Sequence, residues 1–192
     1  LIRQERGCVR MVSSGSLITK KIIAYSFKEL MKQNEFEKIS IKEIMNHADY
    51  RRQTFYDHFS DKYELLDWIY NQEITEIIEH FISYEHWTKI IPRILHYFEK
   101  NKKFYQKTLT IKDHHSFDAC LVQHTQLLFQ NILMENNQQK LPLKQIEQNS
   151  SFYAYGITGI IKSWLLQDCQ TPNNDMENYL ISVIESTIIK ND

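Results

Sequence analysis

The sequence predicts an all-α protein in which an N-terminal three-helix head carries a helix-turn-helix and a larger helical body follows. Three observations lead to this fold class. Only four glycines and three prolines occur in 192 residues. No stretch alternates apolar and polar residues as a half-buried strand would, and apolar residues recur instead at helical spacing. A chain of this length can bury a substantial core.

The formal net charge of −1 conceals an uneven distribution along the chain. Residues 1–62 contain 12 Lys and Arg against 8 Asp and Glu, a balance of +4. Residues 63–192 contain 11 against 16, a balance of −5. A basic head on an acidic body is typical of a protein that touches phosphate at one end only.

The cysteines and the N-terminus indicate a cytoplasmic protein. Cys8, Cys120 and Cys169 are odd in number and have no paired spacing, so we expect a reducing environment and no disulfide framework. No apolar stretch reaches the ~20 residues needed to span a bilayer. The N-terminus lacks the apolar middle region of a signal peptide, and we expect residues 1–16 to be a flexible arm or a non-native extension.

The first helix is expected over about Thr19 to Gln33. Ile23, Phe27, Leu30 and Met31 in it keep the i, i+4, i+7, i+8 spacing of one buried stripe. A capping box over Ser40 to Glu43 then predicts a short helix over about 41–47, in which serine and glutamate satisfy exposed backbone donors.

The flanking residues support this short helix and its end. Ile39 and Ile44 stand at the spacing of a hydrophobic staple, which determines the angle at which the chain enters the helix. The segment Ala48-Asp49-Tyr50 breaks the run. These features predict the first helix of a helix-turn-helix.

A second short helix is expected after this turn, with polar residues outside and aromatic residues inside. Its outward side chains are expected to be Arg51, Arg52, Gln53, Thr54 and Tyr56. Phe55 and Phe59, one turn apart, face inward. Two short helices joined by a turn of about three residues, the second bearing Arg, Gln, Thr and Tyr, have the geometry that enters a major groove.

A second capping box, Asp61 to Glu64, predicts the start of a longer helix. Apolar stripes predict five more helices, at about 87–98, 104–111, 117–134, 143–167 and 176–188. Pro92 indicates a late helix start or a distorted first turn. Residues 171–174 are expected to form a loop before the last helix.

Residues 22–66 resemble the DNA-binding domain of the TetR family of bacterial transcriptional regulators. The resemblance rests on the order of residues 55–59 and 62–66, FYDHF and KYELL, at this distance from a capped Ser40-Ile41-x-x-Ile44. It implies a DNA-binding domain over residues 17–62 and a regulatory and dimerisation domain over 63–192. The chain departs from the family pattern at Asp49, where the turn usually has glycine, and at Arg51, where a small polar cap is usual.

The chemistry of base edges selects two residues as the readers of sequence. Arginine can pair with guanine and glutamine with adenine through two hydrogen bonds each, so we expect Arg52 and Gln53 to read bases. The resemblance implies that Tyr56 and His58 contact phosphate. It implies the same for Lys62, from the positive start of the next helix.

Three further residues are weaker candidates for phosphate contacts. They are Ser40, Thr54 and Arg51, the last as either a poor helix cap or an extra contact. For any one of these polar residues taken alone, an ordinary solvated side chain is the competing interpretation.

One head offers little surface, so two heads are expected on a two-fold symmetric operator with half-sites ~34 Å apart or a multiple of that distance. The resemblance implies that the last two helices form the homodimer contact as a four-helix bundle. Gly156 and Gly159 allow close helix approach there. The other residues expected in this interface are Ile160, Trp164, Leu180, Val183 and Ile184.

The resemblance also implies a ligand pocket in the body. The residues expected to line it are Trp87, Tyr105, Phe117, Cys120, His124 and Trp164. Aromatic residues at helical spacing are as easily core as cavity lining, so both interpretations stay open.

The segment from Phe152 to Leu165 is similar to the C-terminal domain of Firmicute members that activate dihydroxyacetone-kinase operons. That subgroup implies activation of transcription with a coactivator protein related to a kinase subunit. The alternative is a repressor released from its operator by a small-molecule effector.

Other classes of protein fit less well. The chain has no phosphate-binding glycine loop, no nucleophile elbow and no zinc-protease signature, so no enzyme and no cofactor is expected. Cys120 and His124 lie one turn apart with His114, His115 and Asp118 near in sequence, but two potential ligands on one helix face are more often structural, and no metal is expected. A purely structural adaptor would not need the outward Arg-Gln-Tyr arc.

Overall fold

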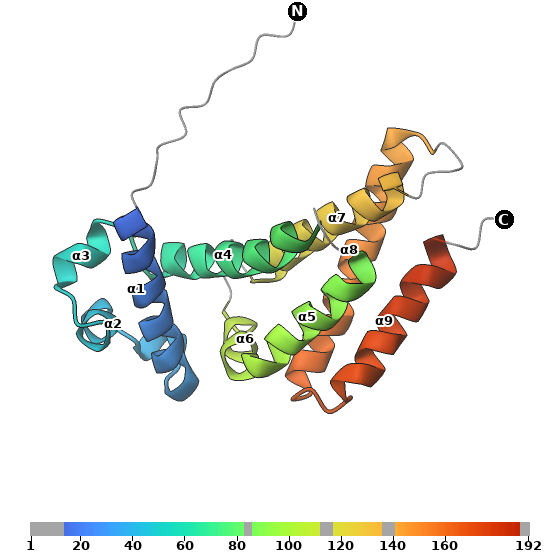
Figure 1. The fold of residues 1–192 in the computed structure, drawn as a ribbon. Helices are drawn as coiled ribbons and strands as arrows, with labels where there is room; N and C mark the ends of the chain where they lie inside the picture. Colours follow the sequence, from blue (N-terminus) through green and yellow to red (C-terminus); the bar gives the residue numbers. More distant parts are fainter. Residues whose placement is uncertain (1–13, 83–85, 112–116, 136–140, 189–192) are drawn as a thin grey trace, which may run out of the picture.

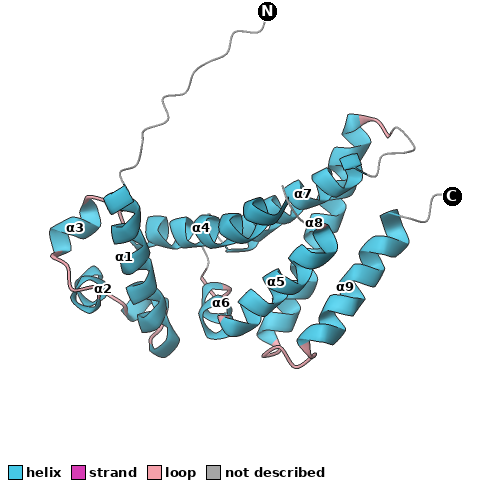
Figure 2. Ribbon diagram, viewed as in Figure 1, coloured by secondary structure: helices cyan, strands magenta, loops and turns pink. Residues whose placement is uncertain are grey.

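The computed structural model describes residues 14–82, 86–111, 117–135 and 141–188, and within these ranges every regular element is a helix (Figures 1 and 2). The all-α prediction is therefore confirmed. The expected arm over residues 1–16 falls almost entirely outside the described residues. In chain order the elements are α1 (Ser14–Gln33), η1 (Phe36–Lys38), α2 (Ile41–His47), α3 (Arg52–Tyr56), α4 (Lys62–Ile82), α5 (Trp87–Lys100), α6 (Lys102–Thr108), α7 (Phe117–Glu135), α8 (Leu143–Leu166) and α9 (Asn173–Ile188).

The helices form a small head and a larger body joined by one long helix. α1, α2 and α3 lie together at one end, and α4 runs from them into the body (Figure 1). In the body α7 packs along α8, and α5 packs against α9. α6 packs against α1, so the body touches the head beside α4 as well as through it.

Apolar side chains from all the helices of the head meet in one core. Ile23 and Phe27 of α1, Ile44 of α2, Phe55 of α3 and Leu65 of α4 are completely buried. Each such side chain contributes about 1.5–3 kcal/mol relative to an exposed one. The inward positions read from the sequence are therefore confirmed at these residues of the head.

Some helix boundaries, and the role of Pro92, differ from the sequence prediction. α1 begins at Ser14, before the expected Thr19, and α9 begins at Asn173, inside the expected loop. α5 begins at Trp87, so Pro92 lies inside the helix and does not mark a late start. Trp87, Ile90 and Ile91 before the proline and Leu95 and Phe98 after it are buried, and this packing holds the turns on either side.

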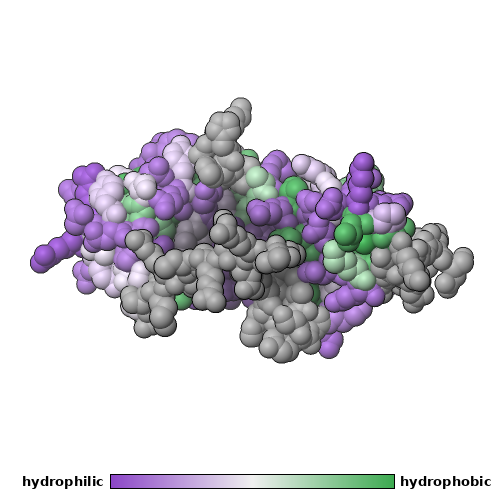
Figure 3. All heavy atoms as spheres, turned by 90° about the horizontal axis from the view of Figure 1, so that it is seen from above, coloured by the Kyte–Doolittle hydropathy of each residue, from purple (hydrophilic) through white to green (hydrophobic). Residues whose placement is uncertain are grey.

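The surface differs between the two ends of the molecule. The face seen in Figure 3 is mostly hydrophilic over the head, and apolar residues reach the surface over the body. None of the described helices is both long enough and apolar enough to cross a bilayer.

Candidate nucleic-acid interface

α2 begins with the capping box that the sequence predicts. The Ser40 hydroxyl accepts a hydrogen bond from the Glu43 amide at 3.2 Å, and the Ser40 amide donates to Glu43 Oε2 at 2.8 Å. The hydrogen bond that the Ser40 hydroxyl donates to Glu43 Oε2, and after it the one from the Ser40 amide, lower the pKa of the Glu43 carboxyl. Ile39 and Ile44 are buried beside the cap, as a hydrophobic staple requires. Ser40 therefore has a structural role whether or not it also contacts phosphate.

The turn between α2 and α3 has a left-handed residue where the family usually has glycine. Asp49 has φ 57°, a conformation that aspartate tolerates better than most residues. The chain then bends back, because the Tyr50 amide donates to the Met45 carbonyl at 3.0 Å. The turn thus has a left-handed residue at the position where the resemblance leads us to expect glycine.

α3 is held in the head by its aromatic residues. Phe55 and Phe59 are buried with ring centres 5.6 Å apart, and Phe59 meets the edge of Trp68 of α4 at 5.9 Å. This anchorage leaves the opposite side of α3 exposed. A five-residue helix has little stability of its own, so tertiary packing maintains it.

The expected Arg-Gln-Tyr arc lies on the exposed side of α3. Arg52 and Gln53 each contact the side chain four residues later, one helical turn along the chain. Arg52 Nη2 donates to the Tyr56 hydroxyl at 3.0 Å, and the guanidinium lies 5.6 Å from the centre of the tyrosine ring. Gln53 Nε2 lies 3.4 Å from Asp57 Oδ1. Both amide and guanidinium groups are exposed, so they can exchange these partners for bases.

The remaining candidates on and around α3 are placed less uniformly. Arg51 is the N-cap residue of α3 and makes no side-chain cap hydrogen bond, so its exposed guanidinium is available. Thr54 and His58 are only half-exposed, and the His58 ring lies 6.5 Å from the Phe59 ring. The prediction that Thr54 faces outward therefore holds only in part.

The Lys62 side chain makes contacts within the head. Its ammonium donates to the Phe36 carbonyl at 2.8 Å and to the Ile39 carbonyl at 2.7 Å, and it lies 4.5 Å from the centre of the Phe36 ring. Burial lowers its pKa. Its predicted phosphate contact has to compete with these three interactions, which join the start of α4 to the segment before α2.

The cap at the start of α4 differs in detail from the predicted box. Asp61 Oδ1 accepts from the amides of Tyr63 and Glu64, at 2.8 and 2.9 Å. Glu64 Oε2, however, accepts from the Ser60 amide at 2.6 Å, one residue before the Asp61 donor that a capping box would use. That bond is the largest cause lowering the pKa of Glu64.

Two exposed residues beside α3 were not among the sequence candidates. Lys42 lies in the first turn of α2, and Tyr50 lies immediately before α3. Lys42 could have been identified as a phosphate-contact candidate from the sequence, because it lies in the first turn of the predicted capped helix. Backbone N–H groups at such a helix start also favour phosphate.

The outer face of α8 has the surface expected of an interface. Phe152 and Tyr155 are 75% and 67% exposed, and Leu166 is exposed on the same helix. A Cβ atom added to Gly156 or Gly159 would meet nothing within 4 Å. Within the described ranges, no residue therefore fills the space that these glycines leave open.

Three of the seven residues expected in the dimer contact are instead internal. Trp164, Leu180 and Ile184 are at most 2% exposed, and the Trp164 indole donates to the Thr171 carbonyl at 2.8 Å. They cannot present a surface to a second chain, because they form the contact between helices of one body. Ile160 and Val183 are partly exposed.

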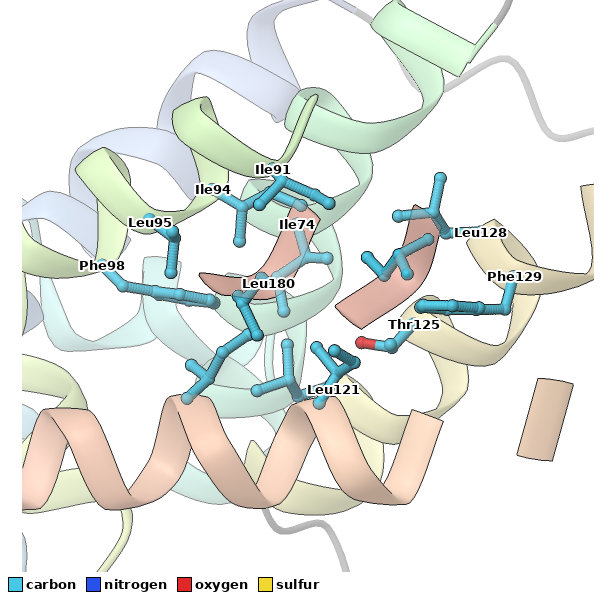
Figure 4. Close-up of a pocket in the computed structure, with 13 residues that line it drawn as sticks. Ile74, Ile91, Ile94, Leu95, Phe98, Leu121, Thr125, Leu128, Phe129 and Leu180 are labelled. Carbon is cyan, nitrogen blue, oxygen red and sulfur yellow. The ribbon is translucent and has the colours of Figure 1, made fainter. Parts of the chain in front are cut away.

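An apolar cavity lies between α4, α5, α7, α8 and α9 (Figure 4). The cavity is small, because only about 30 Å³ of it admits the centre of a water molecule. Thr125 supplies the one polar side chain of the lining. The lining residues are Ile74, Ile91, Ile94, Leu95, Phe98, Leu121, Thr125, Leu128, Phe129, Ile157, Ile161, Leu180 and Ile184.

None of the six residues expected to line a ligand pocket borders this cavity. Tyr105 and Phe117 pack on each other with ring centres 4.7 Å apart, and Trp87 and Trp164 are also buried. They are core residues, so that expectation is wrong about where the cavity lies. The aromatic signal in the sequence came largely from the core, whereas the cavity lining is mostly aliphatic, with Phe98 and Phe129 as its aromatic members.

Cys120 and His124 form a small polar contact between α7 and α4. His124 Nε2 lies 3.2 Å from the Thr75 hydroxyl, and Cys120 Sγ lies 3.7 Å from Asn71 Oδ1. Burial raises the pKa of Cys120 to about 12, which keeps the thiol protonated at neutral pH. In the part of the chain that the structure describes, no three His, Cys, Asp or Glu residues are placed to hold a metal, and His114 and His115 lie outside it.

Comparison with known families covers both halves of the chain. Residues 28–69 match the family described as bacterial regulatory proteins, tetR family. Residues 85–186 match the family described as transcriptional regulator C-terminal region.

Comparison with individual proteins points to one relative in particular. The chain is 43% identical over 96 residues to the HTH-type dhaKLM operon transcriptional activator DhaS of Lactococcus lactis. This match covers 50% of the chain and 51% of the relative, so it spans about half the length of each.

Solved structures extend the likeness to nearly the whole fold. The dihydroxyacetone kinase operon activator DhaS superposes with a TM-score of 0.79 at 26% identity, covering 90% of this chain and 97% of that one. The fatty acid degradation regulator FadR of Bacillus halodurans has a TM-score of 0.66 at 12% identity, covering 90% and 96%. NalD, a repressor of a multidrug efflux pump in Pseudomonas aeruginosa, has a TM-score of 0.63 at 16% identity, covering 88% and 95%. The last two share only the fold.

Proposed function

The chain belongs to the TetR family of bacterial transcriptional regulators, and we propose that it activates the transcription of a dihydroxyacetone-kinase operon. Membership makes it a DNA-binding regulator and not an enzyme. The activator role is supported by one observation above all, the likeness to the operon activator DhaS in sequence over half the chain and in fold over most of it.

At the DNA, α3 is the proposed recognition helix. Arg52 and Gln53 would read guanine and adenine in the major groove, because they are exposed on the side of α3 that the core leaves free. Tyr56, Arg51 and Lys42 would contact phosphates around them. Such contacts place the helix, and the base contacts give the specificity.

Two chains would act together. The exposed apolar residues of α8 and the unfilled space at Gly156 and Gly159 support a homodimer that packs through this helix. A glycine in a helix interior costs about 1 kcal/mol relative to alanine, so these two glycines need a compensating role. Close approach of a partner helix supplies one.

In the proposed activator role the chain would act with a second protein partner in the cytoplasm. That partner is a coactivator protein related to a dihydroxyacetone kinase subunit. The test uses the DNA upstream of the neighbouring kinase genes. Binding of the purified chain, with and without that kinase-related protein, is measured at several salt concentrations. We expect sequence-specific binding that weakens steeply with salt and transcription in vitro that rises when both proteins are present.

A lack of specific binding under every condition would overturn the DNA-binding proposal. Specific binding with transcription that falls when the chain is added would instead support a repressor. The apolar cavity of the body favours that alternative, in which a small apolar effector releases the chain from its operator. The cavity would first have to widen, since its present space admits little more than water.

A further inference from the structure

Four polar side chains from four helices meet where the head joins the body. The Lys28 ammonium of α1 lies 2.6 Å from Glu73 Oε1 of α4 and donates to the Tyr97 hydroxyl of α5 at 3.1 Å. The Tyr105 hydroxyl of α6 donates to Glu73 Oε2 at 2.8 Å. Both oxygens of the carboxylate and the ammonium therefore have partners within one connected network.

This network is largely removed from water. The side chains of Lys28 and Glu73 are only 13% and 21% exposed, and Tyr105 is completely buried. The Lys28 ammonium also lies 5.2 Å from the centre of the Phe104 ring. Charges in such surroundings interact more strongly than on the surface, and removing one partner leaves the other uncompensated.

The body side of the network is rigidly held. The Tyr105 ring packs on Phe98 and Phe117, with ring centres 4.8 and 4.7 Å away. Burial raises the pKa of Tyr105 and of Tyr97, so both hydroxyls stay protonated and Tyr105 keeps the proton that it donates to Glu73. The carboxylate of Glu73 is consequently presented to α1 in one place.

A second ion pair between α1 and α4 is much more exposed to water than the Lys28–Glu73 pair. Lys21 and Glu76 are 2.7 Å apart, but their side chains are 50% and 51% exposed and the pair reaches only α4. Exposed pairs of this kind contribute about 0–1 kcal/mol. It offers a matched control within the same two helices.

We propose that Lys28 and Glu73 are positioning residues that hold the DNA-reading head at a defined angle to the body. Apolar packing between α1 and α6 is non-directional, whereas hydrogen bonds weaken steeply when they bend. Because α1 carries the core on which α3 rests, its angle sets where the recognition helix points. In a dimer that angle sets the half-site spacing that two heads can reach, and this consequence rests on the proposed DNA-binding function.

The first test measures the angle without DNA. Spin labels are placed at Asn46→Cys in α2 and Gln170→Cys after α8, in a chain whose three native cysteines are alanine. Labelled chain is diluted with unlabelled chain so that the distance is intramolecular. The variant Lys28→Met/Glu73→Gln removes both charges but leaves an acceptor for Tyr105, so it avoids an unpaired buried charge.

We expect one narrow head-to-body distance in the parent chain and a broadened distribution in this double variant. The control Lys21→Met/Glu76→Gln should keep the narrow distribution. A folded double variant with the parent distance, or equal broadening in the control, would overturn the proposal. Either result is independent of whether the chain binds DNA.

The second test reads the consequence on DNA. A palindromic site is selected from a random DNA library with the parent chain, and one to three base pairs are then inserted between its halves. The parent should discriminate between spacings, and the double variant should lose roughly 5- to 100-fold of that discrimination with an unchanged affinity for a single half-site. Unchanged spacing discrimination would contradict the proposal.

Discussion

At the scale of single residues, the polar side chains that the motif selects are found in three situations. Arg52 and Gln53 are exposed and paired only within α3. Arg51 is exposed at the helix start, and Lys62 is committed to two backbone carbonyls. A residue with the right chemistry at the right position can thus have either a DNA-reading or a structural role, and substitution can separate the two.

Arg52→Ala should weaken binding to the selected operator by about 1–3 kcal/mol and relax the preference at one base position. The reason is the loss of a bidentate contact that other base pairs cannot offer. Competition binding against operators changed at each position measures it. Arg51→Ala is the comparison, because loss of a phosphate contact should weaken all sequences alike. A uniform loss in Arg52→Ala would assign that residue to phosphate as well.

Lys62→Met should lower the free energy of unfolding by about 1–3 kcal/mol, since it removes hydrogen bonds from a charged donor to the Phe36 and Ile39 carbonyls. Urea unfolding measures the change, with the exposed Lys42→Met as a control expected to stay within about 0.5 kcal/mol. Unchanged stability together with a salt slope reduced by about one would instead make Lys62 a phosphate contact.

At the scale of elements, local chemistry at the ends of helices shapes the head. The start of α2 follows the predicted capping box, and the start of α4 uses Asp61 with Glu64 reaching Ser60. The turn between α2 and α3 depends on one left-handed residue, Asp49. Two predictions concern these features.

Asp49→Gly should give a more stable head than Asp49→Ala, by about 1 kcal/mol, because glycine adopts φ 57° without a Cβ clash. Thermal unfolding of the two variants measures the difference. Equal stabilities would show that the turn relaxes out of the left-handed conformation when aspartate is replaced.

The head should lose stability in acid through Glu43 and Glu64. Hydrogen bonds lower the pKa of both carboxyls from the usual 4.5, so the folded head binds fewer protons than the unfolded chain. Their stabilisation is complete above 4.5 and is lost as the pH falls through the lower, folded values. Urea unfolding at a series of pH values measures this loss, which should be smaller in Glu43→Gln/Glu64→Gln. An identical pH dependence in that variant would assign the acid sensitivity to other groups.

At the scale of the whole molecule, α8 has an exposed face in a single chain, and we propose that a second copy of the chain packs against it. Phe152 and Tyr155 are the largest exposed apolar surfaces on that helix, and Gly156 lies next to them. The head needs this assembly, because one recognition helix contacts a single half-site.

Gly156→Leu should convert the dimer to monomers without unfolding the chain. The added side chain meets nothing within the chain's own fold and raises helix propensity, but it would clash with a partner helix. Sedimentation velocity measures the association state. Gln123→Leu, which adds the same side chain on the exposed face of α7, should leave the dimer intact. A stable dimer in Gly156→Leu and in Phe152→Ser would exclude this face as the interface.

The sequence alone determined the helical fold, the buried residues of the head helices and the cap of α2, together with the family. These features depend on residues within about one or two helical turns of each other, where spacing is set by the helix itself. The exposed arc of α3 was predictable for the same reason.

Only the tertiary structure decided which residues meet across helices. Lys62 finds carbonyls 23 and 26 residues earlier, and Lys28 finds Tyr97 69 residues later. Trp164 and the aromatic pocket candidates lie in the core, while a different and mostly aliphatic set of side chains lines the cavity. The physical reason is that helical periodicity gives the direction of a side chain around its own helix. The partner it reaches depends on how whole helices cross, which no local pattern encodes.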